Sequence, residues 1–287
     1  ELLELHTVSP SAKYTEADIR GAAKVLAGWG GDPGKILKNP GTIKDTHREV
    51  MEVGGTLNSW DYFKKRYAEP GSKTVLGKVI SNGKGGLREL TDFLASHEHT
   101  INFIAFKLAQ HFVSDNPSQS DLNHIKSAWK GSNGDLDQIH TAVIERAIAS
   151  KEPKFQWPMN WLFQVVRLSG ANGFQGWQEV KDDSYNDEIM NTREIFFELG
   201  QSFWLPGQPN GYSSDKNEWL SGEMFERRIR FATALYSGGF PTQNNEDIMN
   251  RIGANDVTRN MVASVKGNKN KFVALMCSPE IMGLENA

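Results

Sequence analysis

Residues 157–168 read Trp-Pro-Met-Asn-Trp-Leu-Phe-Gln-Val-Val-Arg-Leu, and this stretch decides the fold class. Pro158 suits the first turn of a helix, because the N–H group that proline lacks would have no partner there. Trp161 and Val165 follow one turn apart, on the face that the apolar spacing predicts to be buried. Glycines that begin at Gly170 end the pattern. The stretch therefore predicts a helix with one side in a hydrophobic core.

Helical patterns recur on both sides of this stretch. Thr15 and Asp18 have the spacing of a capping box, and Ile19, Ala22 and Leu26 then share one helical face. Further helical patterns cover residues 86–112, 118–129, 135–147, 192–203 and 221–236. The sequence therefore predicts a mainly α fold, an irregular multi-helix bundle with long loops rich in glycine and asparagine.

Two regions break the helical periodicity. Residues 31–85 are rich in Gly, Asn and Pro and read as an irregular insertion, and residues 204–220 read as an irregular loop. Within the insertion, Tyr62-Phe63 and the Thr-Val-Leu segment at 74–76 can pair as one small β-hairpin. No repeat of fixed period occurs. The length allows one large domain or two modest ones, and we predict a single helical domain over residues 1–287.

Composition places the chain among ordinary globular proteins. The 287 residues are 23% charged and 38% hydrophobic, with a formal net charge of -3. This balance excludes a disordered or collagen-like chain and lacks the basic surplus of a dedicated nucleic-acid binder. Basic residues cluster at 64–66, 227–230 and 266–271, but in separate segments, where solvated helix faces and helix C-termini explain them. We therefore expect no nucleic-acid partner.

The sequence predicts no cofactor and no metal site. Its single cysteine, Cys277, excludes an intrachain disulfide and any site built from several thiolates, and its apolar neighbours indicate a buried, unreactive thiol. A His-Glu-x-x-His pattern is absent. Residues 71–78 look like a phosphate-binding loop, but five residues separate the glycines and Val79 follows the lysine, so nucleotide binding is rejected. No apolar run approaches the length of about 18 residues that a transmembrane segment needs.

Several elements, in order, resemble one bacterial family. They are Glu-Leu-Leu-Glu-Leu-His-Thr at 1–7, Gly-Ser-Lys-Thr-Val-Leu-Gly at 71–77, the helical segment 103–115, Leu-Gly-Gln at 199–201 and Pro-Asn-Gly-Tyr at 209–212. This series resembles the family catalogued as domain of unknown function 1800. The resemblance covers most of the chain to about residue 240.

The resemblance implies where the protein is located, but it does not imply a reaction. It implies an exported bacterial protein, periplasmic or extracellular, which acts beside a second envelope protein. Residue 1 is followed by no charged and then apolar segment of the kind that begins a targeting peptide, so any such peptide would lie upstream. It also indicates a C-terminal portion of the family pattern, because the family places its Glu-Leu-x-Glu-Leu-His-Thr element well inside the chain. Ala68-Glu69 stands where the family tends to have His-Asp, so no role for that histidine carries over. The family has no settled activity.

Glu4 and His6 are the candidate catalytic residues of the sequence. In an extended segment, residues two apart point to the same side, so a carboxylate and an imidazole could orient one another or share a metal ion. The alternative is that both side chains cap or cross-link the next helix. If they are catalytic, the protein is an envelope hydrolase that uses Glu4 and His6.

Aromatic residues near glycine-rich and asparagine-rich loops indicate a second kind of site. Flat rings beside amides suit carbohydrate binding, because a ring supplies apolar area and an amide supplies oriented hydrogen bonds. The candidate ligand-binding residues are Trp177, Trp204, Tyr212 and Trp219. The alternative is that loop tryptophans plug the ends of the helical bundle. The leading prediction is a non-enzymatic exported domain that binds or organises envelope or extracellular material such as polysaccharide.

Overall fold

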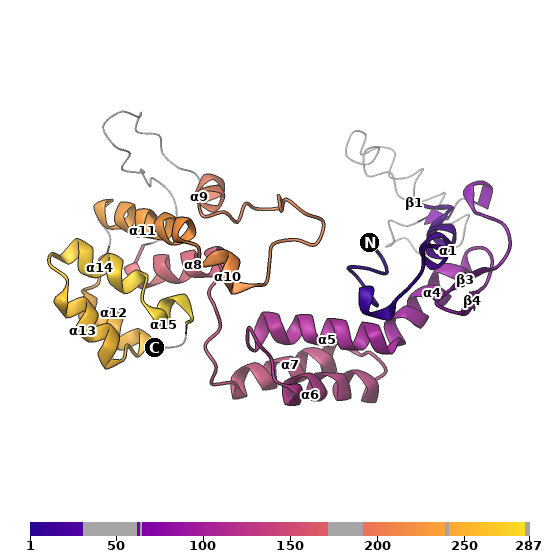
Figure 1. The fold of residues 1–287 in the computed structure, drawn as a ribbon, viewed down its shortest axis with the longest axis horizontal. Coiled ribbons are helices and arrows are strands. Elements are labelled where there is room, and N and C mark those ends of the chain that lie inside the picture. Colours follow the sequence, from indigo (N-terminus) through magenta and orange to yellow (C-terminus); the bar gives the residue numbers. More distant parts are fainter. Residues whose placement is uncertain (31–61, 64, 172–191, 239–240, 285–287) are drawn as a thin grey trace. The chain divides into compact units, whose positions relative to one another are not determined.

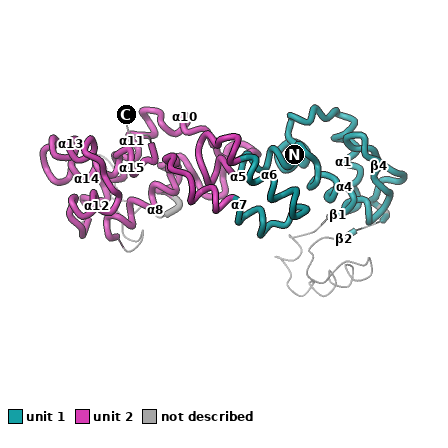
Figure 2. The backbone as a smooth tube through the Cα atoms, turned by 90° about the horizontal axis from the view of Figure 1, so that it is seen from below, with its two compact units in different colours: residues 1–107, 122–142 teal, residues 108–121, 143–287 magenta. Residues whose placement is uncertain are grey.

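The computed structural model describes residues 1–30, 62–63, 65–171, 192–238 and 241–284. The chain divides into two compact units, which Figure 2 colours separately. Unit 1 comprises residues 1–107 and 122–142, and unit 2 comprises residues 108–121 and 143–287. This division does not measure whether either unit folds alone, so the single domain over residues 1–287 stays a prediction.

The described first part of unit 1 combines helices with short antiparallel strand pairs (Figure 1). Its elements are the 3-10 turn Pro10–Ala12, α1 (Glu16–Leu26), β1 (Trp29–Gly30), β2 (Tyr62–Phe63), the 3-10 turn Lys65–Tyr67, β3 (Lys73–Val75), β4 (Lys78–Ile80) and α4 (Gly85–Ser96). Strand β1 pairs with β2, and β3 pairs with β4. The predicted small hairpin is therefore confirmed.

The partner predicted for Tyr62-Phe63 is wrong. Leu76 and Gly77 have φ values of 49° and 77°, the two positive values that a tight two-residue hairpin turn needs. Such a turn folds residues 73–75 directly back onto residues 78–80. Tyr62-Phe63 pairs instead with Trp29-Gly30, and the rings of Phe63 and Trp29 lie 5.4 Å apart.

Helix α1 begins at the predicted capping box. The Thr15 hydroxyl accepts a hydrogen bond from the Asp18 backbone N–H at 3.3 Å, and an Asp18 carboxylate oxygen accepts one from the Thr15 N–H at 2.8 Å. The other oxygen of Asp18 accepts from the backbone N–H of Leu76 at 2.7 Å, which ties the start of α1 to the hairpin. Gly21 allows α1 to lie this close to β3, because the Cβ atom of any other residue there would lie 2.3 Å from the carbonyl oxygen of Thr74.

The buried face of α1 differs from the predicted one. Ala22 and Val25 are buried, whereas Ile19 and Leu26 are exposed. The close approach of Gly21 to β3 sets this rotation, because it turns the glycine side of the helix to the hairpin. The core of this region consists of Leu3, Val8, Ala22, Val25, Val75, Ile80, Leu90 and Leu94.

Three helices follow, and the boundary between the units passes through each of them. They are α5 (Glu98–Phe112), α6 (Gln119–Gly131) and α7 (Leu136–Ala149). Ile101, Ile125 and Ile139 are buried, one from each helix. Asp121 and Arg146, on the parts of α6 and α7 that belong to unit 2, form an ion pair at 2.6 Å.

Every regular element among the described residues of unit 2 is a helix. Its helices after α7 are α8 (Pro158–Ser169), α9 (Thr192–Glu198), α10 (Lys216–Trp219), α11 (Gly222–Ser237), α12 (Asn245–Ile252), α13 (Asp256–Ser264), α14 (Asn268–Met276) and α15 (Pro279–Met282). Helix α14 contacts α11, α12, α13 and α15, so it is central to this unit. None of the helices in the described ranges is long and apolar enough to span a bilayer. The predicted mainly α class is confirmed.

Helix α8 has the predicted buried face. Trp161, Leu162, Val165 and Leu168 are all buried in the core of unit 2. The indole N–H of Trp161 donates a hydrogen bond to the carbonyl oxygen of Met276 at 2.9 Å, so the burial of this polar group is compensated. This contact joins α8 to the end of α14.

Helix α11 differs from its predicted orientation at one end. The apolar spacing of residues 221–236 predicts that Phe225, Ile229, Ala232 and Leu235 face inward. Ala232 and Leu235 are buried, but Phe225 is exposed and Arg228 is buried. A prediction from apolar spacing places every arginine on the surface of the protein. It therefore could not place the guanidinium of Arg228 in the core.

Candidate binding pocket

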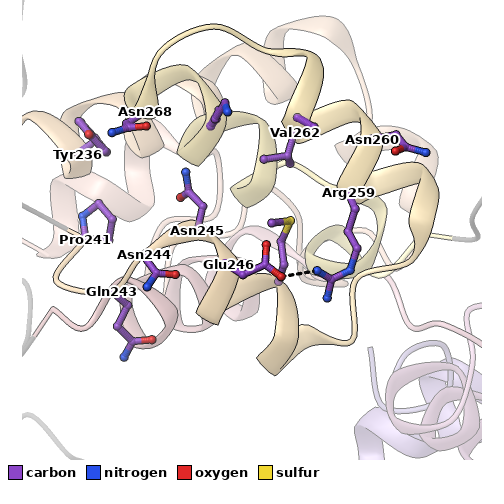
Figure 3. A pocket seen from close by; sticks show the side chains of 13 residues that line it. Tyr236, Pro241, Gln243, Asn244, Asn245, Glu246, Arg259, Asn260, Val262 and Asn268 are labelled. Carbon is purple, nitrogen blue, oxygen red and sulfur yellow. Dashed lines mark hydrogen bonds and ion pairs between the residues drawn. The ribbon is translucent and has the colours of Figure 1, made fainter.

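Unit 2 contains a cavity of about 950 Å³ framed by α11, α12, α13 and α14 (Figure 3). Ligand sites in proteins are concave, and about 300 to 1,000 Å³ is their usual range. The feature that distinguishes this cavity is its amide side chains, namely Gln243, Asn244, Asn245, Asn260 and Asn268.

The turns at the ends of α12 place the amides around the cavity. The side-chain oxygen of Asn244 accepts a hydrogen bond from the backbone N–H of Asp247 at 2.8 Å and so caps α12. Gly253, with a φ of 64°, ends the helix, and Asn255 then caps α13. This short connection folds α13 back beside α12, so that residues from both helices line one cavity.

An ion pair forms one wall of the cavity. The Arg259 guanidinium binds the Glu246 carboxylate at 2.7 Å, as Figure 3 shows. The same guanidinium donates to the Asn250 side-chain oxygen at 2.8 Å and to the Ala254 carbonyl oxygen at 3.0 Å. Three partners therefore fix Arg259, and the charges of Glu246 and Arg259 compensate one another.

The five amides differ in what they bind. Gln243 accepts a hydrogen bond from Arg251 at 2.8 Å, and Asn244 is engaged as a helix cap. Within the described part of the chain, the side chains of Asn245, Asn260 and Asn268 have no hydrogen-bond partner. In Figure 3 the Asn245 side chain points into the space between α12 and the helix that carries Asn268. These amides are free to bind a ligand.

Tyr236 adds an aromatic ring to the cavity. Its ring lies 5.7 Å from that of Phe272, which is fully buried in the core of unit 2. This contact holds the ring in place, and no described residue binds the Tyr236 hydroxyl. The cavity thus combines an anchored ring with free amides.

The structure does not place Glu4 and His6 in an extended segment, so that premise is wrong. Residues 2–5 form a turn, in which the Leu5 N–H donates to the Glu1 carbonyl oxygen at 2.8 Å. Both Glu4 and His6 are exposed, and neither forms a hydrogen bond or ion pair with a described residue. Glu4 borders a small hollow of about 160 Å³ that His6 does not line. A catalytic role for Glu4 and His6 therefore stays a prediction.

Three of the four candidate aromatic residues are described, and their environments differ. Trp204 and Tyr212 lie in the loop between α9 and α10, and Trp219 lies in α10. Trp219, at the end of α10, is buried, and its indole N–H donates to the carbonyl oxygen of Ser213 at 2.9 Å. The Tyr212 hydroxyl donates to the carbonyl oxygen of Ser202 at 2.7 Å, and its ring lies 6.0 Å from Trp219. Trp204 is 94% exposed.

Neither Trp204 nor Tyr212 nor Trp219 lines the cavity framed by α11 to α14. Trp177 lies outside the described residues. Over the ranges that the structure describes, no three His, Cys, Asp or Glu side chains are grouped to hold a metal ion.

The sequence does carry a signal for the cavity that the search for aromatic residues missed. Eight amide side chains lie between residues 243 and 270, an unusual density for so short a segment. Some of these amides serve as helix caps, and only the folded structure separates them from the free ones. The run Gln243-Asn244-Asn245 shows this, because its last residue alone has no partner.

The fold and the cavity define a mainly helical protein with an amide-lined cavity in its second unit. The chain belongs to the family described as Protein of unknown function (DUF1800), whose model matches residues 1–280. The prediction that the chain is a C-terminal portion of the family pattern is not borne out by this match. No curated protein and no solved structure matches this chain.

Proposed function

We propose that this protein binds polysaccharide or a similar polyhydroxylated compound, and that the amide-lined cavity of unit 2 is the binding site. The observation that carries the proposal is the set of three partnerless amides, Asn245, Asn260 and Asn268, on one cavity. Each amide offers both a donor and an acceptor, which matches the hydroxyl pairs of a sugar. The ring of Tyr236 supplies the apolar surface on which a sugar face can lie.

Binding without catalysis fits the charged groups of this cavity. Glycoside hydrolysis needs two carboxyl groups about 5 to 10 Å apart. The lining has one carboxylate, Glu246, and Arg259 already binds it. A second carboxylate for acid or base catalysis is missing from the described lining.

The proposal extends to the compartment through the family. An exported protein of the bacterial envelope meets polysaccharide there, and a neighbouring envelope protein would be its partner. The resemblance of residues 1–7 and 71–77 to the family elements supports this part of the proposal. The alternative, a hydrolase that uses Glu4 and His6, gains no support from the turn that exposes both side chains.

Thermal unfolding with soluble oligosaccharides tests the proposal. A ligand that binds only the folded state raises the midpoint, with about 2.7 kcal/mol of stabilisation at a hundredfold excess over its Kd. We expect a saturable rise for the natural protein and none for the double variant Asn245→Ala, Asn268→Ala.

The matched control is Asn160→Ala, which removes an exposed amide of α8 outside the cavity lining. This control should keep the full rise. If the double variant keeps the rise as well, the ligand binds elsewhere and the cavity is not the site.

A further inference from the structure

We infer that the ligand of the cavity is an acidic carbohydrate, and that Lys271 binds its anionic group. This inference rests on the proposed function and adds the charge class of the ligand. It starts from the balance of charge inside the cavity.

Among the described residues, the cavity carries one uncompensated positive charge. The charged residues of this described lining are Glu246, Arg259 and Lys271. The first two form an ion pair at 2.7 Å and cancel. Lys271 is partly buried on α14, and none of the described residues forms an ion pair with it. An ammonium group that loses part of its hydration gains most from a bound anion.

The sequence around Lys271 leaves it without an acidic neighbour. Residues 257–279 contain four basic side chains and no aspartate or glutamate. Glu280, the next acid along the chain, is engaged by α13: its two oxygens accept hydrogen bonds from the Asn255 N–H at 3.0 Å and the Thr258 hydroxyl at 2.7 Å. No carboxylate of this segment is therefore available to neutralise Lys271.

The free amides and the ammonium group fit one kind of ligand. Asn245 and Asn268 suit the hydroxyl groups of a sugar, and Lys271 suits a carboxylate or sulfate on the same molecule. A neutral sugar would leave the ammonium group without a counterion. A uronic acid polymer satisfies both sets of groups.

Uronate hexamers and their methyl esters provide a matched pair of probes, because they share the same sugar chain and the ester removes the negative charge of each carboxylate. Calorimetric titration of the natural protein in 50 mM NaCl should give a Kd for the hexauronate about tenfold below that of its ester, a difference of about 1.4 kcal/mol. In 500 mM NaCl the difference should shrink, because salt screens the interaction of exposed and partly exposed charges.

Two lysine variants locate the charge that matters. Lys271→Gln should bind acid and ester equally well, and Lys269→Gln should behave as the natural protein, because Lys269 is exposed on the same helix but does not line the cavity. Inorganic sulfate at the same concentration as the hexauronate should not displace it, since the amides recognise the sugar.

Each contrary outcome has its own meaning. Equal affinities of the natural protein for acid and ester would overturn the acidic-ligand inference and leave polysaccharide binding intact. An unchanged preference in Lys271→Gln would overturn the acidic-ligand inference as well. Full displacement by inorganic sulfate would show that the site recognises the anionic group alone, and it would contradict sugar recognition by the amides. Binding of neither probe, together with no response to any neutral oligosaccharide, would overturn the proposed function itself.

Discussion

The guanidinium carbon of Arg228 lies 5.2 Å from the centroid of the Trp161 ring, inside the core of unit 2. Arg228 is 1% exposed. It donates hydrogen bonds to the Gln156 carbonyl oxygen and the Met282 sulfur, both at 3.0 Å, and forms no ion pair with a described carboxylate. Burial lowers the pKa of Arg228 to about 10, so the group stays charged at neutral pH. Ring faces and a carbonyl oxygen take the place of a counterion.

Replacement of Arg228 by methionine is expected to change the free energy of unfolding little or to raise it. A buried charge costs several kcal/mol of desolvation, and apolar residues of similar volume often remove that cost without loss. Arg228→Ala should instead lower the free energy by about 3 kcal/mol, because it leaves a cavity beside Trp161. Urea unfolding measures both. A loss of about 3 kcal/mol in Arg228→Met as well would show that the guanidinium contacts are net stabilising.

Cys277 should react slowly with thiol reagents in the folded protein. Burial raises the pKa of its thiol to about 12, although the nearby Arg228 acts in the opposite direction. At pH 8 only about one thiol in 10⁴ is then ionised, and the thiolate is the reactive form. Labelling with an aromatic disulfide should proceed orders of magnitude faster in 6 M urea than in buffer. Fast labelling of the native protein would contradict the burial of this thiol.

The helices were predictable to the extent that local signals set them. The capping box at Thr15 and Asp18 and the proline at the start of α8 mark helix starts by interactions within one turn, and both lie where predicted. The rotation of α1 was not predictable, because the contact of Gly21 with Thr74 joins residues far apart in the sequence.

The cavity was less predictable than the helices, for a related reason. Its free amides Asn245 and Asn268 come from two helices that only tertiary packing brings together. The predicted site consisted of aromatic residues, because the sequence shows which residues are aromatic. It does not show which amide side chains lack a hydrogen-bond partner in the folded protein. Trp219 illustrates the limit, since its ring is buried and its N–H donates to the Ser213 carbonyl oxygen in the loop that precedes α10.

Truncation of Trp204 and of Trp219 should change the free energy of unfolding by very different amounts. Trp204→Ala removes a 94% exposed ring and should change the free energy of unfolding by less than about 0.5 kcal/mol. Trp219→Ala removes a buried ring and should cost about 3 to 5 kcal/mol. Urea unfolding followed by circular dichroism compares them. A large loss in Trp204→Ala would show that its exposed ring is covered in the protein in solution.

Gly21→Ala should destabilise the protein, against the usual effect of alanine in a helix. Alanine in place of glycine inside a helix normally gains about 1 kcal/mol. At Gly21 the new Cβ would lie 2.3 Å from the Thr74 carbonyl oxygen, so α1 and β3 must separate. We expect a net loss of about 1 to 3 kcal/mol in urea unfolding. Gly131→Ala, at the end of α6 with open space around its Cβ, is the control and should not lose stability.

Asp121 should make the stability of the protein depend on pH in the acid range. Burial acts to raise the pKa of its carboxyl, but hydrogen bonds from the Ser118 hydroxyl at 2.6 Å and from Arg146 at 2.6 Å outweigh it and hold the pKa below its usual value. A carboxyl with a lowered folded-state pKa stabilises the fold above its unfolded-state pKa of about 3.9, and this contribution is lost as the pH falls through the folded-state value.

Asp121→Asn is therefore expected to cost about 1 to 3 kcal/mol at pH 7, because it leaves the Arg146 guanidinium without its counterion. The difference in the free energy of unfolding between the variant and the natural protein should narrow as the pH falls below about 4. The natural carboxyl is then protonated and, like the asparagine, uncharged. Thermal unfolding from pH 7 to pH 2 measures the gap. Asp137→Asn, an exposed carboxylate in the first turn of α7, should show a small gap at every pH. If the Asp121→Asn gap stays constant down to pH 2, the ion pair with Arg146 does not contribute through its charge.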